Sequence, residues 1–367
     1  MTCAQQLQFE NYPDDSYRYD YDRSREYMIE RVARYPGVVA LYEYGVVGAP
    51  GLSDLDFIVV LSDNLPGTDL SDLIFMQDVP SYVGKTLDGS ILRSMSQTQF
   101  SKVQLLGNIK TRLLWGDRVT HEPLSEADKI WVKIADVMDW LPERVLMLRD
   151  YATMEVIPVK RLVGCLHSFQ HSMQRAFDID PSFKGERLVS FQNRLGLLRQ
   201  TWFDANQSHN RTELSELMYE GITIGSRLMV DFGRFLLSKG YYPQDDLEPG
   251  GIFYLNPRKW YRFSSLSESV HIERIACGGL FVDVPTVWYS HLEQYASSKG
   301  RISGLIRQNL AVKLILKTGR MDPALKHILD ARIQLCNDMA AYLQQAGLGQ
   351  ALYRFAHIKP VLEQDEG

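Results

Sequence analysis

Two aspartates separated by a single residue, Asp54 and Asp56, stand directly before an apolar run at 57–61. On an extended strand, residues two apart point to the same side, so both carboxylates would project together while Leu55 faces away. Two adjacent carboxylates repel each other, and a cation between them removes that repulsion. Magnesium suits this position, because one or two carboxylates hold it while water and substrate phosphates fill its other sites. The pair therefore predicts a metal site for phosphoryl transfer, in which two such ions can clamp the attacking and leaving oxygens.

A glycine-rich loop precedes the two aspartates. Residues 45–53 hold three glycines and a proline, a composition typical of a tight connection. Glycines allow backbone N–H groups to approach phosphates closely. We therefore expect Gly45, Gly48 and Ser53 to shape a triphosphate pocket beside the metal site.

The elements that must position this loop are short and apolar. Residues 38–42 are rich in β-formers, and 56–61 form a nearly continuous apolar run of the kind buried on both faces of a sheet. Helical spacing of apolar residues begins at Asp22 and ends at 35–37, Tyr-Pro-Gly. A third strand is expected within 86–96.

This order of strand, glycine-containing loop and Asp-x-Asp opening an apolar strand resembles the DNA polymerase β-like nucleotidyltransferase superfamily. The family pattern is a Gly-Ser pair, a spacer, and Asp-x-Asp or Asp-x-Glu within hydrophobic residues. Residues 44–45 (Tyr-Gly) and 53–56 (Ser-Asp-Leu-Asp) match it. The resemblance covers residues 22–118, and 113–116 (Leu-Leu-Trp-Gly) are similar to the Leu-Leu-Tyr-Gly that closes the domain in small members.

The resemblance implies a nucleotidyltransferase that moves a nucleoside monophosphate from a nucleoside triphosphate, such as ATP, to an acceptor hydroxyl with release of pyrophosphate. Asp54 and Asp56 would hold Mg²⁺, as two ions, with Mn²⁺ as a possible substitute. The family's third carboxylate lies on the next strand, where Asp88 is the first candidate and Asp78 the second. That group would complete the metal site or help to deprotonate the acceptor.

The chain departs from the family pattern at the phosphate site. Val46 occupies the position of the serine that helps to hold the triphosphate, and the loop contains no lysine or arginine. Lys160, which opens a predicted helix further along, is the candidate for reaching the phosphates. These departures motivate an alternative hypothesis, a catalytically inactive nucleotide-binding or regulatory protein on the same fold.

The chain changes character after residue 117, where apolar residues recur at helical spacing. We predict an α+β protein with three parts: an N-terminal arm at 1–21, a small mixed-sheet nucleotidyltransferase-like domain at 22–120, and a mostly helical substrate-binding region at 121–367. Within that region, helices are expected at 303–316 and 323–346. Residues 241–290 should be irregular with one or two short strands.

Composition and net charge exclude some classes of binding partner. The 367 residues are 45% hydrophobic and carry a net charge of −5, which argues against a nucleic-acid coat or a template polymerase. A small-molecule acceptor is favoured over a protein or a tRNA. The four cysteines form no paired motif, the N-terminus does not resemble a signal peptide, and no apolar run reaches the length of about 18–20 residues needed to cross a bilayer. We therefore expect a cytoplasmic protein without a membrane partner.

Two other motifs are weaker. Residues 84–86 (Gly-Lys-Thr) resemble the end of a P-loop, but Val79 stands where its first glycine is required. His167 and His171 have the spacing of a zinc-binding pair on a helix, but no third ligand is evident. We interpret both histidines as packing or surface residues.

Overall fold

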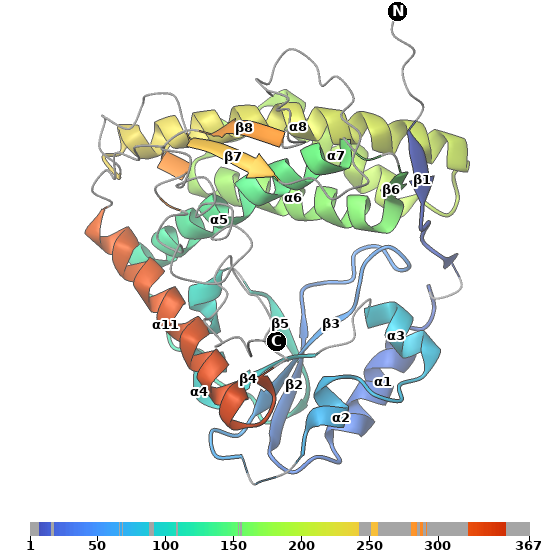
Figure 1. Cartoon of the computed structure of the whole chain (residues 1–367), viewed down its shortest axis with the longest axis vertical. Coiled ribbons are helices and arrows are strands. Elements are labelled where there is room, and N and C mark those ends of the chain that lie inside the picture. Colours follow the sequence, from blue (N-terminus) through green and yellow to red (C-terminus); the bar gives the residue numbers. More distant parts are fainter. Residues whose placement is uncertain are drawn as a thin grey trace, which may run out of the picture. The chain divides into compact units, whose positions relative to one another are not determined.

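The fold was analysed in a computed structural model of the chain (Figure 1). The structure describes residues 7–15, 18–65, 67, 69–87, 92–107, 109–152, 154, 156–241, 251–255, 280–284, 287–288, 291 and 322–349. These form two compact units, which are treated separately below. The sheet unit contains Asp14–Val132 and His327–Gly367, and the helical unit contains Met1–Pro13 and Lys133–Lys326.

The sheet unit is built on a four-stranded mixed sheet in the order β4-β3-β2-β5. Central strand β2 is antiparallel to both β3 and β5, whereas β3 is parallel to β4. The strands are β2 (Val38–Tyr44), β3 (Asp56–Leu61), β4 (Arg93–Ser96) and β5 (Thr111–Gly116). The predicted strands at 38–42, 56–61 and within 86–96 are therefore confirmed, as is the α+β class with a small mixed sheet.

Three helices cover one face of this sheet (Figure 1). They are α1 (Tyr21–Val32), α2 (Ser71–Ile74) and α3 (Ser81–Leu87). Their apolar residues share a buried core with Leu41 of β2 and with Phe57 and Val59 of β3. Because strand side chains alternate between faces, this core fixes which residues of β2 and β3 point away from the helices.

The other face of the sheet packs against short helical segments, α4 (Gln97–Ser101) and η2 (Val103–Leu106). The rings of Tyr42 and Phe100 lie 4.5 Å apart between their centroids. The Ser96 hydroxyl caps α4 by accepting the backbone N–H of Gln99. This cap ends β4 and starts the helix at the same residue.

In its described residues, the helical unit has four long helices (Figure 1). They are α5 (Glu126–Ala152), whose first turns belong to the sheet unit, α6 (Val159–Ile179), α7 (Glu186–Gln200) and α8 (Gln207–Ser238). Of these, α6, α7 and α8 pack against one another, and α5 contacts α6 and α8. Their backbones approach closely at Gly225, where a Cβ would lie 2.4 Å from Val145 Cγ2 and 2.9 Å from Phe169 Cε2. The helical spacing of apolar residues predicted α5, α6 and α8, because each buries one apolar face, whereas α7 was not predicted.

Two small sheets complete the helical unit. β1 (Gln8–Glu10) pairs in parallel with β6 (Val156–Pro158), and β7 (Gly251–Leu255) pairs in antiparallel fashion with β8 (Leu280–Val284). The last pair agrees with the short strands expected in the irregular region. The helix expected at 303–316 lies outside the described residues.

The C-terminal helix α11 (Pro323–Gln345) matches the helix expected at 323–346, but from His327 onward it belongs to the sheet unit. Tyr342 Oη donates a hydrogen bond to the Ser62 carbonyl (2.6 Å), and Gln99 Nε2 donates to the Asp338 carbonyl (2.9 Å). Leu343 is fully buried in the sheet core. The two units are therefore not consecutive along the chain.

The two compact units differ from the parts expected at 1–21, 22–120 and 121–367, whose boundaries stay a prediction. The first residues belong to the helical unit because β1 hydrogen-bonds to β6, and residues from His327 belong to the sheet unit. The expected boundaries assumed that each domain is one continuous segment. The N-terminal residues and the C-terminal helix α11 instead contact segments that are distant in the sequence. Within the described parts of the chain, no helix has the length and apolar character required to cross a membrane.

Candidate functional site

The loop at 45–53 connects the two central strands. Gly45 directly follows β2 and has φ +82°, a left-handed conformation that favours glycine, and its N–H donates to the Lys110 carbonyl (2.9 Å). Gly45, Val46 and Gly48 are exposed, with Val46 74% exposed. Three of the predicted nucleotide-binding residues therefore lie on the outer surface of this loop.

Ser53, the fourth predicted residue of the loop, closes it from inside. Its hydroxyl accepts the Ala49 N–H (3.2 Å), and its own N–H donates to the Ala49 carbonyl (2.8 Å). The Tyr21 hydroxyl at the start of α1 donates to the Ser53 carbonyl (2.6 Å) and accepts the Gly51 N–H (2.8 Å). Ser53 therefore fixes the shape of the loop that leads into Asp54.

The two aspartates lie on either side of a buried anchor. Leu55 is 1% exposed, and its N–H donates to the Thr86 carbonyl at the end of α3 (2.8 Å). Asp54 is exposed and lies just before β3, whereas Asp56 is the first residue of β3 and pairs with Tyr44 across the strands. The sequence analysis assumed that both aspartates lie on one strand. Only Asp56 lies on β3, and Asp54 lies in the adjoining loop.

Asp56 has an internal cation as its partner. Arg93, the first residue of β4, brings Nη1 to 2.8 Å from Asp56 Oδ1. The same guanidinium lies 4.8 Å from the centroid of the Tyr44 ring. Three adjacent strands therefore contribute one residue each to a cluster of Tyr44, Asp56 and Arg93. Sequence reasoning missed Arg93, although a single arginine in an otherwise uncharged strand segment calls for a buried partner.

The third carboxylate is not found on the described part of the next strand, because β4 (Arg93–Ser96) contains no acidic residue. Asp88, the first candidate, lies outside the described residues. Asp78, the second, is exposed in a turn after α2 with φ +53°. In the described ranges, no group of three or more His, Cys, Asp or Glu side chains could hold a metal ion.

Lys160 lies in the first turn of α6, within the helical unit. Its backbone N–H donates to the Asn11 carbonyl at 3.4 Å, beside the short β1–β6 pair. Its predicted role at the phosphates stays a prediction.

A second charged cluster lies on the opposite face of β2. Glu43, adjacent to Tyr44, is 4% exposed and accepts hydrogen bonds from Arg25 Nε (3.0 Å) and Nη2 (2.9 Å) and from Arg112 Nη2. Burial alone would raise the pKa of the Glu43 carboxyl, but the hydrogen bonds from both arginines outweigh burial and hold the pKa below its ordinary value. This cluster joins α1, β2 and β5 beneath the candidate site.

Neutralising Glu43 should change both stability and its pH dependence. Glu43→Gln leaves two arginines without their shared anion, so the free energy of unfolding at pH 7 should fall by about 3 kcal/mol. The folded-state pKa lies below the unfolded value of about 4.3. The ion pairs therefore stabilise the fold above that pH, and this contribution is lost as pH falls through the lowered pKa.

Chemical denaturation at pH 7 and across the acid range below pH 5 measures both effects. Wild type should lose more stability on acidification than Glu43→Gln. Asp22→Asn is the matched control, because Asp22 pairs with Arg25 from a side chain that is 91% exposed and should change little. Equal acid sensitivity in wild type and Glu43→Gln would contradict this account.

The histidine pair on α6 forms a hydrogen-bonded network of its own. Arg199 Nη1 lies 2.7 Å from His167 Nδ1, and the Nε2 atoms of His167 and His171 are 3.2 Å apart. Burial, with the nearby Arg199 charge, lowers the pKa of His167 to about 3. Because Arg199 donates to Nδ1 of neutral His167, the ring proton lies on Nε2 and can be donated to His171. The arrangement supports the packing interpretation rather than zinc binding.

Polar side-chain pairs link the elements of the helical unit. Asp136 of α5 pairs with Arg175 of α6 (2.6 Å), and Asp139 pairs with His291 (2.9 Å), both residues of the latter pair having fully buried side chains. Asp136 and Asp139 are one helical turn apart, so they lie on one face of α5. Their partners identify that face as an internal polar contact of this unit.

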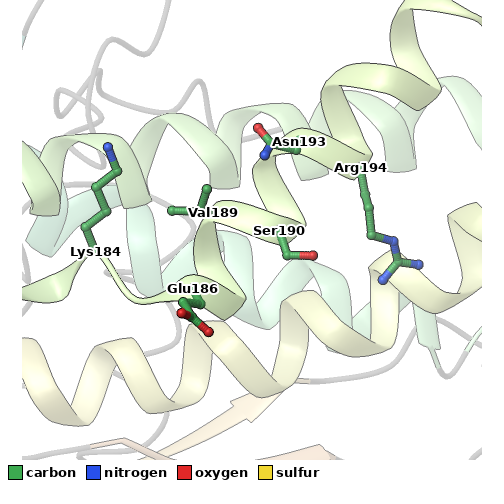
Figure 2. Close-up of a pocket in the computed structure, with 6 residues that line it drawn as sticks. All are labelled: Lys184, Glu186, Val189, Ser190, Asn193 and Arg194. Carbon is green, nitrogen blue, oxygen red and sulfur yellow. The ribbon is translucent and has the colours of Figure 1, made fainter.

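A hollow of about 510 Å³ lies along α7 and the turn before it, and Figure 2 shows the side chains that line it. Its lining residues are Lys184, Glu186, Val189, Ser190, Asn193 and Arg194. Arg194 is already bound by three glutamates of α8, each at 2.8 Å. Its charge is therefore compensated within the helical unit.

The chain was compared with protein-family models, with curated proteins and with solved structures, and none of these comparisons gives a match.

Proposed function

We propose that the chain is a divalent-cation-dependent nucleotidyltransferase that transfers a nucleoside monophosphate from a nucleoside triphosphate to an acceptor hydroxyl. The observation that carries the proposal is the constrained, exposed loop at 45–53, which ends at an exposed Asp54 and a partly exposed Asp56 on a central strand. The exposed backbone around Gly48 would lie beside two carboxylates, a combination suited to phosphoryl transfer.

The donor atoms suit a hard cation. Asp54 and Asp56 supply carboxylate oxygens, and Asp56 is 26% exposed, which leaves its carboxylate within reach of solvent. They would hold Mg²⁺, or Mn²⁺ in its place, and the bound ions would offset the charge that develops on the phosphates. Gly45 and Gly48 would allow the backbone to approach the triphosphate, and Asp88 is the proposed group that takes the acceptor's proton. A small molecule remains the favoured acceptor.

Melting temperatures with each of the four nucleoside triphosphates, with and without Mg²⁺, test the binding part of this proposal. A ligand that binds only the folded state stabilises it by about 2.7 kcal/mol at a hundred times its dissociation constant. We expect a rise for the preferred triphosphate that requires Mg²⁺, accompanied by pyrophosphate release once an acceptor is supplied. No rise with any of the four would contradict the proposal.

A second candidate function is a nucleotide-binding or regulatory protein without turnover. Two observations favour it. Arg93 forms an ion pair with the Asp56 oxygen that a metal ion would use. Val46 exposes an apolar side chain at the position where a hydroxyl group would assist phosphate binding. Under this hypothesis a nucleotide raises the melting temperature, but no pyrophosphate forms with any acceptor. Simultaneous measurement of melting and of pyrophosphate therefore separates the two candidates.

A further inference from the structure

Asp56 is the carboxylate of the site that is already neutralised by the protein itself. Its Oδ1 lies 2.8 Å from Arg93 Nη1 in an ion pair, and the Arg93 side chain is only 10% exposed. We infer that Arg93 competes with the divalent cation for Asp56, so that the cation binds fully only when the guanidinium leaves this carboxylate. The inference rests on the proposed function, because it concerns the same site.

Several contacts keep Arg93 where it is. The guanidinium is bound to Asp56 on one side and stacks over the Tyr44 ring, with 4.8 Å between the guanidinium carbon and the ring centroid. Its backbone is fixed in the parallel ladder beside Ile58. An ion pair and a cation–π contact are each stronger in a shielded position than in water. Before a metal ion binds, Asp56 therefore pairs preferentially with the Arg93 guanidinium.

A divalent cation and this guanidinium exclude each other for two reasons. The guanidinium occupies an oxygen of Asp56 that the cation would use as a ligand. Like charges at such a short separation also repel strongly when water screens them incompletely. Binding of one therefore weakens binding of the other at Asp56.

The site nevertheless permits exchange. Asp56 is 26% exposed, so solvent and ions reach it, and exposed Asp54 offers a second carboxylate beside it. The loop at 45–53 contains no lysine or arginine. A triphosphate lying along that loop would therefore give the released guanidinium a new anionic partner. Cation binding and triphosphate binding then favour each other, and the cation alone binds weakly.

Titration with Mn²⁺ alone, followed by the electron paramagnetic resonance signal of the free ion, measures this competition directly. Arg93→Met removes the charge while keeping an unbranched side chain against Tyr44, and it should tighten Mn²⁺ binding about tenfold. Arg93→Lys keeps a positive charge and should bind Mn²⁺ much as wild type does. Circular dichroism and the melting temperature establish that each variant is folded. If Arg93→Met does not fold, Arg93→Gln, which can still hydrogen-bond to Asp56, replaces it.

Arg112→Gln is the matched control. Arg112 carries the same charge on the same sheet but binds Glu43 on the opposite face, and Arg25 continues to neutralise Glu43 in its absence. Loss of Arg112 should therefore leave Mn²⁺ affinity unchanged. An equal gain in Arg112→Gln and Arg93→Met would indicate a general effect of net charge and would overturn the inference.

The remaining outcomes separate this inference from the proposed function. Equal Mn²⁺ affinity in wild type and Arg93→Met, lost in Asp54→Asn, would overturn the competition and leave the proposed function in place. Tighter binding in Arg93→Met without pyrophosphate release by any form would support the competition and contradict the transfer reaction. Absence of Mn²⁺ binding in every form would overturn both.

Discussion

Replacement of Asp54 by asparagine is expected to lower nucleotidyl transfer by more than about 100-fold, because loss of a residue that only orients a metal ligand already costs about 10–100-fold. The same change should abolish the Mg²⁺-dependent rise in melting temperature with the preferred triphosphate. Asp54 is exposed, and the substitution preserves its shape, so the fold should be unaffected. Pyrophosphate release and thermal melting measure the two effects on one sample.

Glu30→Gln provides the control for Asp54→Asn. Glu30 is an exposed carboxylate on α1 of the same unit, so its substitution removes one negative charge without touching the loop at 45–53. We expect wild-type transfer and wild-type nucleotide stabilisation in this variant. Retention of full activity in Asp54→Asn would remove Asp54 from the site and with it the metal arrangement proposed above.

Gly116→Ala is expected to cause the largest loss of stability in the sheet unit. Gly116 ends β5 with φ +84°, and a Cβ there would lie 2.1 Å from the Val39 carbonyl oxygen and 2.9 Å from Ala40 Cα. The obstructing atoms belong to the backbone of a central strand, so they cannot rotate away. Left-handed strain of about 1–2 kcal/mol and overpacking of about 1–3 kcal/mol should together lower the free energy of unfolding by about 2–5 kcal/mol. Urea denaturation gives the value.

Gly45→Ala isolates the steric part of that loss. Gly45 has a similar φ of +82°, but no atom lies within 4 Å of the position that its Cβ would occupy. Only the conformational strain applies, so the expected loss is about 1–2 kcal/mol. If both alanine variants lose equal stability, the close approach of β5 to β2 at Gly116 is not present in solution.

The sequence predicted those elements whose signal is local. Strands β2 and β3 were identified by apolar runs, and α5, α6 and α8 by one-sided apolar spacing, because each segment carries its own burial pattern. Strand β5 was recognised only as the close of the domain. Its residues are partly exposed, so pairing with β2, rather than burial, defines it. The return of α11 to the sheet unit has no local signal at all.

Some features of the candidate site also have a local signal in the sequence, whereas others depend on contacts between distant segments. Asp54 and Asp56 could be found because the loop, the aspartates and the following strand are contiguous in sequence. The ion pair with Arg93 depends on the parallel register of β3 and β4, which brings together segments separated by α2 and α3. A register is set by strand pairing across the whole sheet, so it cannot be derived from one segment. The position of the predicted third carboxylate would depend on the same register of β3 and β4.

The return of α11 also sets an order of events during synthesis. Ser62 leaves the ribosome long before Tyr342, which binds its carbonyl, and Leu343 is still absent from the sheet core while the four long helices emerge. Domains generally fold as they are made, starting from the N-terminal end. Here most of the sheet unit is synthesised before the four long helices, but its last segment follows them. Until then its nascent chain lacks Leu343 and Leu348, so part of the apolar core of this unit stays uncovered during synthesis.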